Sequence, residues 1–180
     1  MSGDAYGREA LGRDPSTWDM DQLRRFVEGA RSEELETPRV AAQTHAYNPN
    51  LPEESRRQWA KLSLLANRLV TAEGEGPLTR VKQQDFMLRM WVIDRLGPDD
   101  TDPDWCPEAL AADTLRALRL TPAQAAALSD GWRDLPLDQI RRLRWHKNLT
   151  AHARCLLAYL PPGRTREQLQ TWVSIRRSLP

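Results

Sequence analysis

The side chains that could bind a metal or act as a nucleophile are three histidines and two cysteines. They are His45, His146, His152, Cys106 and Cys155. His146 and His152 lie six residues apart in the sequence, whereas two metal ligands on one helix face are separated by three or four. Cys155 lies in an apolar stretch, where a cysteine is usually an unreactive packing residue. The sequence also lacks a glycine-rich phosphate-binding loop. The spacing therefore predicts no catalytic residue, no metal site and no cofactor.

The distribution of charge along the chain is more informative. The whole sequence has 26 Lys and Arg against 25 Asp and Glu, a formal charge of +1. Residues 131–180 alone hold ten basic and three acidic side chains, so they carry +7 and leave −6 to residues 1–130. A basic segment joined to an acidic one predicts either a polyanionic partner or charge pairing within the fold.

The basic side chains would share one face if residues 138–160 formed a single helix. At helical spacing that face and its flanks consist of Arg141, Arg144, Trp145, Asn148 and His152, with Arg142, Lys147 and Arg154 beside them. Guanidinium groups bind phosphate and an indole can stack on a base, so this face suits a nucleic-acid backbone. The alternative is a solvated face that pairs with the acidic part of the same fold.

Composition favours a soluble cytoplasmic protein. Of the 180 residues, 40% are hydrophobic, which is enough for one compact domain or two small ones. No stretch approaches the ~20 apolar residues of a membrane span, and the first residues lack the basic and apolar regions of a signal peptide. Two cysteines are too few for a disulfide framework. We expect the seven tryptophans to be packing residues, because an indole buries a large area.

The pattern of apolar residues predicts an all-α fold, a bundle of seven or eight helices. Apolar residues recur every three to four positions, and no alternating strand pattern competes. The expected helices cover 20–29, 38–47, 52–69, 79–96, 107–119 and 122–128, followed by two or three within 137–178. Asp19, Thr37 and Thr121 are the expected N-caps, and Thr165 with Gln168 forms an expected capping box.

These elements are expected to form two packed helical halves behind a flexible tail at residues 1–14. The halves would cover 15–97 and a basic 107–180, joined near 97–106 by an acidic loop that we interpret as a solvated linker. The helix at 79–96 is apolar on every side after Asp85, so it should lie centrally in the core. Arg89, four residues after Asp85, is the expected end of a local ion pair.

One short signature occurs twice in the chain, as Asp-Gln-Leu-Arg-Arg-Phe at 21–26 and as Asp-Gln-Ile-Arg-Arg-Leu at 138–143. Further short motifs follow in order at 59–62, 153–156, 163–169 and 172–173. Taken together, these motifs resemble the small, all-helical subunit of type I-E CRISPR Cascade complexes, over about half of the chain.

The resemblance implies a non-enzymatic subunit of an antiviral defence complex, which packs beside copies of itself along a guide-RNA filament. Its Lys and Arg side chains would stabilise the R-loop through the nucleic-acid backbone, while base pairing supplies sequence specificity. The positions that match the motifs are Arg24, Arg25, Arg141, Arg142, Arg154, Arg164 and Arg166. The charge pattern alone adds Arg144, Trp145, Lys147, Arg176 and Arg177.

Three hypotheses follow for the function. The first is a helical accessory subunit that binds DNA or RNA backbone non-specifically within a larger complex, through its C-terminal third. The second is a protein–protein adaptor, in which exposed tryptophans and the basic face dock an acidic partner. The third, and least favoured, is a small helical enzyme that uses His45, Tyr47, Arg89 or His146 in a tryptophan-lined pocket.

Overall fold

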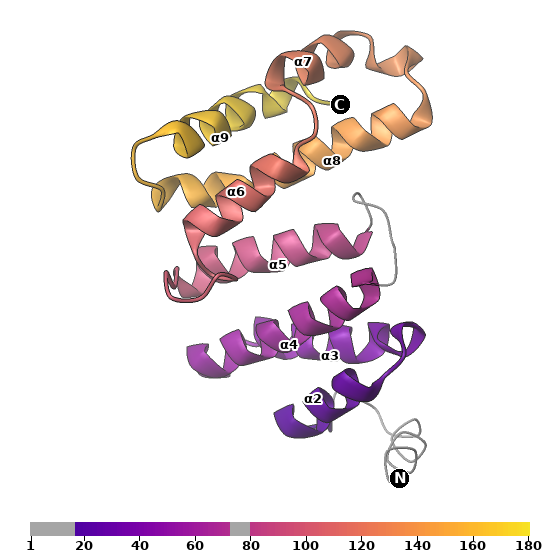
Figure 1. Ribbon diagram of the computed structural model, residues 1–180, viewed down its shortest axis with the longest axis vertical. Helices are drawn as coiled ribbons and strands as arrows, with labels where there is room; N and C mark the ends of the chain where they lie inside the picture. Colours follow the sequence, from indigo (N-terminus) through magenta and orange to yellow (C-terminus); the bar gives the residue numbers. More distant parts are fainter. Residues whose placement is uncertain (1–16, 73–79) are drawn as a thin grey trace. The chain divides into compact units, whose positions relative to one another are not determined.

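The described secondary structure of the chain is entirely helical, which confirms the all-α prediction. The computed structural model describes residues 17–72 and 80–180, where eight α-helices, α2 to α9, are found (Figure 1). The chain divides into two units, Met1–Gly76 (unit 1) and Pro77–Pro180 (unit 2). No described helix is both long and apolar enough to cross a membrane.

Unit 1 is built from α2 (Met20–Gly29), α3 (Glu36–Tyr47) and α4 (Glu53–Ala72), with a short 3-10 turn, η2 (Ser32–Glu34), before α3. Helix α2 begins with a capping box at the predicted N-cap, because Asp19 accepts a hydrogen bond from the Gln22 backbone N–H at 2.8 Å. The helices enclose a core whose members include Leu23, Val27, Leu35 and Trp59.

The predicted N-cap of α3 is wrong. The N-cap is Leu35, and Thr37 lies exposed within the first turn of the helix. Leu35 is buried and closes the preceding turn through its backbone N–H, which donates to Ser32 O at 3.3 Å. The position of the helix start is therefore set by burial of a leucine and not by a side-chain cap.

Unit 2 contains the five helices α5 (Arg80–Leu96), α6 (Pro107–Ala117), α7 (Pro122–Asp130), α8 (Leu137–Ala153) and α9 (Arg164–Ile175). It also contains the 3-10 turns η3 (Trp132–Asp134), η4 (Arg154–Ala158) and η5 (Arg176–Ser178). Helix α5 packs against α6, α8 and η4, and Leu88, Val92 and Ile93 are among its buried residues, so its predicted central place in the core is confirmed. Thr121 caps α7 as predicted.

The predicted boundary between the halves, near 97–106, is wrong, because α5 belongs to the same unit as the helices that follow it. Arg89 of α5 holds the acidic loop within unit 2: its guanidinium donates to Pro103 O at 3.0 Å, to Asp104 O at 3.2 Å and to Asp113 of α6 at 3.0 Å. The loop is therefore not a solvated linker. The expected tail at 1–14 lies outside the described residues, as does most of the expected loop at 71–77.

The condition under which the basic face was drawn, a single helix at 138–160, is not met, because α8 ends at Ala153 and the chain continues as η4. Helix α9 then begins at Arg164, and its N-cap is Gly163, whose φ of +151° favours glycine. Since Thr165 lies inside the first turn, the capping box predicted from Thr165 to Gln168 does not form.

Candidate nucleic-acid interface

Unit 2 is divided sharply by charge. Residues 80–136, which form α5 to α7, hold seven Lys and Arg against ten Asp and Glu, whereas residues 137–180 hold nine against two. The excess of positive charge therefore belongs to α8, α9 and the 3-10 turns that follow them. Helices α8 and α9 lie side by side in the fold (Figure 1).

Helix α8 presents one face to the core and the other to solvent. Its 17 residues span about 25 Å along the helix axis. The buried face consists of Leu143, Trp145, His146, Leu149, Thr150 and Ala153. The exposed polar residues of α8 are Asp138, Arg141, Arg142, Arg144, Asn148 and His152. The arginines of the predicted basic face are thus exposed, whereas its aromatic residue, Trp145, is buried.

The assignment of Trp145 to the basic surface is wrong. Its side chain is 5% exposed and packs edge-on against Phe86 of α5, with the ring centroids 6.2 Å apart. A buried indole cannot stack on a base. The exposed aromatic side chain of this region is instead Tyr159, the residue that follows η4, which is 42% exposed and which the sequence reasoning missed. Its position just before Pro161-Pro162, where a helix must end, was the available signal.

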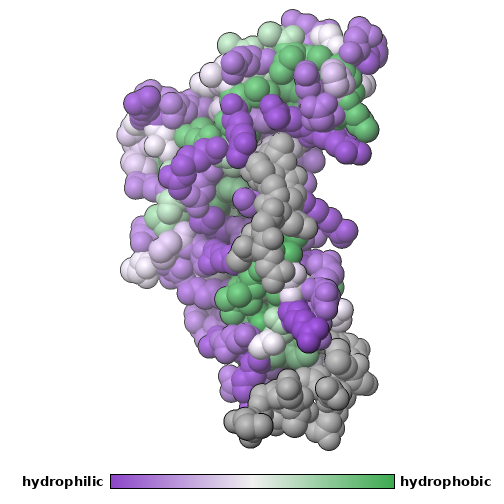
Figure 2. Space-filling model, turned by 45° about the vertical axis from the view of Figure 1, so that its right-hand side comes forward, coloured by the Kyte–Doolittle hydropathy of each residue, from purple (hydrophilic) through white to green (hydrophobic). Residues whose placement is uncertain are grey.

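The arginines of 137–180 are not neutralised by the acidic part of the fold. None of these eight side chains forms an ion pair with a described residue, in contrast to Arg89, Arg95 and Arg116 on α5 and α6. The alternative of a face paired with acidic residues of the same fold is therefore not what the described residues show. On the face in Figure 2, hydrophilic and hydrophobic side chains are interspersed over the surface of unit 2.

The tertiary structure brings η5 to α8. Lys147 lies half-buried on α8, and its Nζ donates a hydrogen bond to Leu179 O at 2.9 Å. Leu179 is 2% exposed, and η5 packs against α8. Arg177 is exposed and Arg176 half-buried, so η5 carries two further arginines next to α8.

The remaining predicted arginines lie elsewhere. Arg154 is exposed on η4, and Arg164 and Arg166 are exposed on the first turn of α9, where Arg166 donates to Leu160 O at 2.8 Å. Arg24 and Arg25 are exposed on α2 of unit 1, and Arg25 Nε donates to Asp21 O at 3.2 Å. The predicted arginines of unit 2 are therefore distributed over α8, η4, α9 and η5, and Arg24 and Arg25 belong to unit 1.

His146 lies beneath the basic face of α8 and is fully buried. Its Nδ1 lies 2.6 Å from Arg142 O, the geometry of an N–H donating to that carbonyl, while Nε2 is buried without a hydrogen-bond partner. Burial lowers the pKa of His146 from its ordinary value of 6.5; the bond to the Arg142 carbonyl opposes this shift, and the positive charge of Arg142 adds to it. The ring is therefore held neutral.

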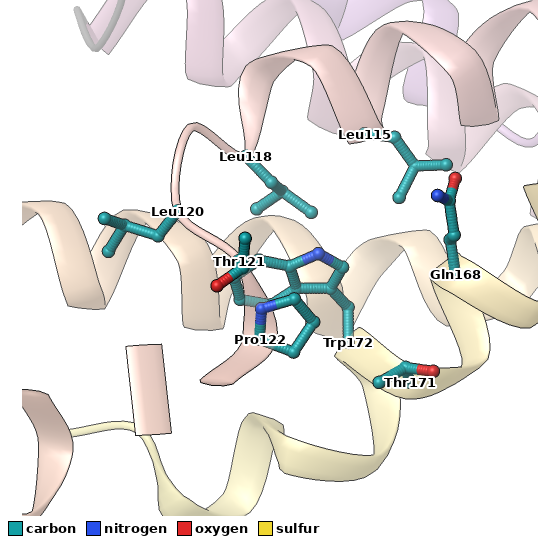
Figure 3. A pocket seen from close by; sticks show the side chains of 8 residues that line it. All are labelled: Leu115, Leu118, Leu120, Thr121, Pro122, Gln168, Thr171 and Trp172. Carbon is teal, nitrogen blue, oxygen red and sulfur yellow. The ribbon is translucent and has the colours of Figure 1, made fainter. Parts of the chain in front are cut away.

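The residues of the enzyme hypothesis are divided between the two units, with His45 and Tyr47 in unit 1 and Arg89 and His146 in unit 2. His45 stacks on Trp59 in unit 1, at 4.4 Å between centroids, whereas Arg89 is bound to the acidic loop of unit 2. A pocket of about 320 Å³ lies between α6, the start of α7 and α9, with the indole of Trp172 at its centre (Figure 3). Its other lining residues are Leu115, Leu118, Leu120, Thr121, Pro122, Gln168 and Thr171. None of the four proposed catalytic residues lines it.

Metal ligands and relatives add no further assignment. Among the described residues, no group of three His, Cys, Asp or Glu side chains is placed to hold a metal ion. The resemblance to the Cascade small subunit stays a prediction. Comparisons with protein-family models, with curated proteins and with solved structures found no match to this chain.

Proposed function

We propose that this protein is a non-catalytic subunit that binds the phosphate backbone of a nucleic acid through unit 2, without reading its sequence. The surface that would bind consists of Arg141, Arg142, Arg144, Arg154, Arg164, Arg166, Arg176 and Arg177, called here the basic surface. The observation that carries the proposal is the concentration of arginines without an acidic partner in residues 137–180 of the described chain.

Arginine suits this role for physical reasons. The guanidinium group is planar, always charged and weakly hydrated, and it binds two phosphate oxygens at once. A nucleic-acid duplex carries one charge per about 1.7 Å of its axis, so a helix about 25 Å long can face many phosphates. Because the chain as a whole carries only +1, attraction to a polyanion would come from this local surface and not from net charge.

The setting of this activity is also part of the proposal. The motif resemblance supports a subunit of a CRISPR ribonucleoprotein complex in the cytoplasm, where base pairing between other components supplies specificity. The exposed Tyr159 offers one aromatic ring for stacking on an unpaired base.

The adaptor hypothesis loses its main anchors. Tryptophans are frequent anchors of protein interfaces, yet each of the seven tryptophans here is buried or half-buried. This agrees with their predicted role in packing. An adaptor would have to dock its partner through arginines and a few scattered apolar side chains, such as Leu137 and Tyr159.

The test is binding of a labelled single strand and a labelled duplex, followed by fluorescence anisotropy at about 50 and 200 mM salt, where backbone binding weakens steeply. The double variant Arg141→Glu/Arg142→Glu should lose this salt-sensitive binding while keeping its helical circular dichroism spectrum. The matched control is Arg95→Glu/Arg119→Glu, which makes the same change of charge at exposed arginines outside the basic surface. Equal losses in both variants, or no salt-sensitive binding by the unchanged protein, would contradict the proposal.

A further inference from the structure

We propose that Lys147 is a positioning residue, which holds residues 176–179 against α8 so that Arg176 and Arg177 become part of the basic surface. This inference rests on the proposed function, since it concerns how the surface is assembled. It replaces the sequence-based assignment of Lys147 as a residue whose main role is to contact nucleic acid.

The ammonium group of Lys147 is already engaged in the fold. Its Nζ donates to Leu179 O over 2.9 Å, and the two residues lie 32 positions apart in the sequence. The side chain is half-buried, whereas Arg141 and Arg144 on the same helix are exposed. A partly buried ammonium group with a fixed carbonyl acceptor is less available to phosphate than a solvated guanidinium.

The segment that carries Arg176 and Arg177 continues directly from α9, which holds it at its N-terminal end only. The turn η5 is three residues long, and a helical turn of that length is unstable in isolation. The Leu179 N–H donates to Arg176 O at 3.3 Å and closes the end of this turn. The segment must therefore be anchored by packing and by contacts to other elements.

Two anchors are present, and both are at Leu179. The leucine side chain is 2% exposed and belongs to the core of unit 2, together with Leu143 and Leu149 of α8. Its carbonyl receives the Lys147 hydrogen bond. Arg176 and Arg177 lie between the end of α9 and this anchor, so we expect their place beside α8 to depend on it.

The first experiment measures the salt slope for a labelled duplex, which is the magnitude of the fall of log K with log salt concentration. Each lost phosphate contact lowers this slope by about 1. Leu179→Ala removes no charge, yet it should lower the slope by about 2, through Arg176 and Arg177. Lys147→Met should also lower it by about 2, whereas Lys147→Arg should leave it unchanged. Neither Lys147→Met nor Leu179→Ala should have a further effect in the Arg176→Ala/Arg177→Ala background.

The control for general loosening of the core is Leu118→Ala, a leucine of the same core cluster placed after α6. It should leave the slope unchanged. A fall of only about 1 in Lys147→Met, persisting in the Arg176→Ala/Arg177→Ala background, would identify Lys147 as a direct phosphate contact and overturn the inference.

The second experiment does not depend on nucleic acid. Amide hydrogen exchange of residues 176–179 should speed up in Lys147→Met and not in Arg154→Met, which removes an exposed charge on η4. Unchanged exchange in Lys147→Met overturns the inference even if the protein binds nucleic acid. Faster exchange in a protein that binds no nucleic acid overturns the proposed function instead, and with it the purpose assigned to the anchor.

Discussion

Acidification below about pH 6.5 should destabilise unit 2 through His146. The native structure keeps this imidazole neutral, because the ring is fully buried and no described hydrogen-bond acceptor lies beside Nε2 to stabilise a second N–H. In the unfolded chain the same ring takes up a proton near its ordinary pKa of 6.5. Below that pH the unfolded state therefore binds more protons than the native state, and the free energy of unfolding falls as the pH falls.

The magnitude follows from this difference in bound protons. One proton of difference changes the free energy of unfolding by up to about 1.4 kcal/mol per pH unit, in the window between pH 6.5 and the lower pKa of the native state. At pH 5.0 the loss that His146 causes is therefore at most about 2 kcal/mol. Below the native pKa the loss should level off, because both states are then protonated.

The assay is urea unfolding of the unchanged protein and of His146→Gln, at half-unit steps from pH 7.5 to 4.5. Protonation of carboxylates affects both proteins, so the informative quantity is the difference between their unfolding free energies. This difference should shift in favour of His146→Gln as the pH falls below 6.5. His152→Gln is the matched control, since His152 also has its Nδ1 close to the carbonyl four residues earlier, at 2.8 Å from Asn148 O, but is exposed. A difference between His146→Gln and the unchanged protein that does not vary with pH would refute the reasoning.

Three further outcomes follow from described contacts. Arg89→Met should lower the free energy of unfolding by about 3 kcal/mol in a urea titration, because it leaves two loop carbonyls and three nearby carboxylates without their buried cation. Arg95→Met, which removes an exposed ion pair, should change the free energy of unfolding little in the same titration. Asp19→Ala should lower the free energy of unfolding by about 1 kcal/mol, because the α2 capping box is lost. Asp19→Asn should keep most of this stabilisation, and thermal unfolding measures both effects. Burial raises the pKa of Cys155 to about 11 from 9.0, so in a Cys106→Ser background its reaction with Ellman's reagent at pH 8 should be about 100-fold slower in the native than in the urea-unfolded protein; equal rates would contradict the burial argument.

Local signals in the sequence predicted most of the helices. The capping box at Asp19 and the Thr121-Pro122 start each depend on atoms within three residues, so the sequence alone specifies them. The predicted N-caps Thr37 and Thr165 were wrong because in each case the helix has its N-cap two residues earlier. Burial of Leu35 selected the first, and a left-handed glycine, Gly163, selected the second. Such choices between neighbouring positions depend on packing that local patterns do not contain.

The site was predicted in part for the same reason. Helical spacing placed Arg141 and Arg144 on one exposed face, as the structure has them. Helical spacing placed Trp145 on this face as well, because a residue at the edge of a helix face can point to solvent or to the core. Trp145 is buried because it packs against Phe86 of another helix, which the local sequence does not show. Tyr159 was missed, since a 3-10 turn breaks the period on which the predicted face depended.

The sequence by itself determined that this protein is all-helical and that its basic residues are concentrated in the last third. Periodicity, caps and charge counts are local or additive properties, and they survive without knowledge of the fold. Only the tertiary structure decided that Arg89 ties the acidic loop to α5 and α6, so that residues 97–106 are no boundary. It also decided that Lys147 meets Leu179 and that η5, with Arg176 and Arg177, packs against α8. These contacts join residues 14 to 32 positions apart, and their formation depends on which surfaces the core brings together.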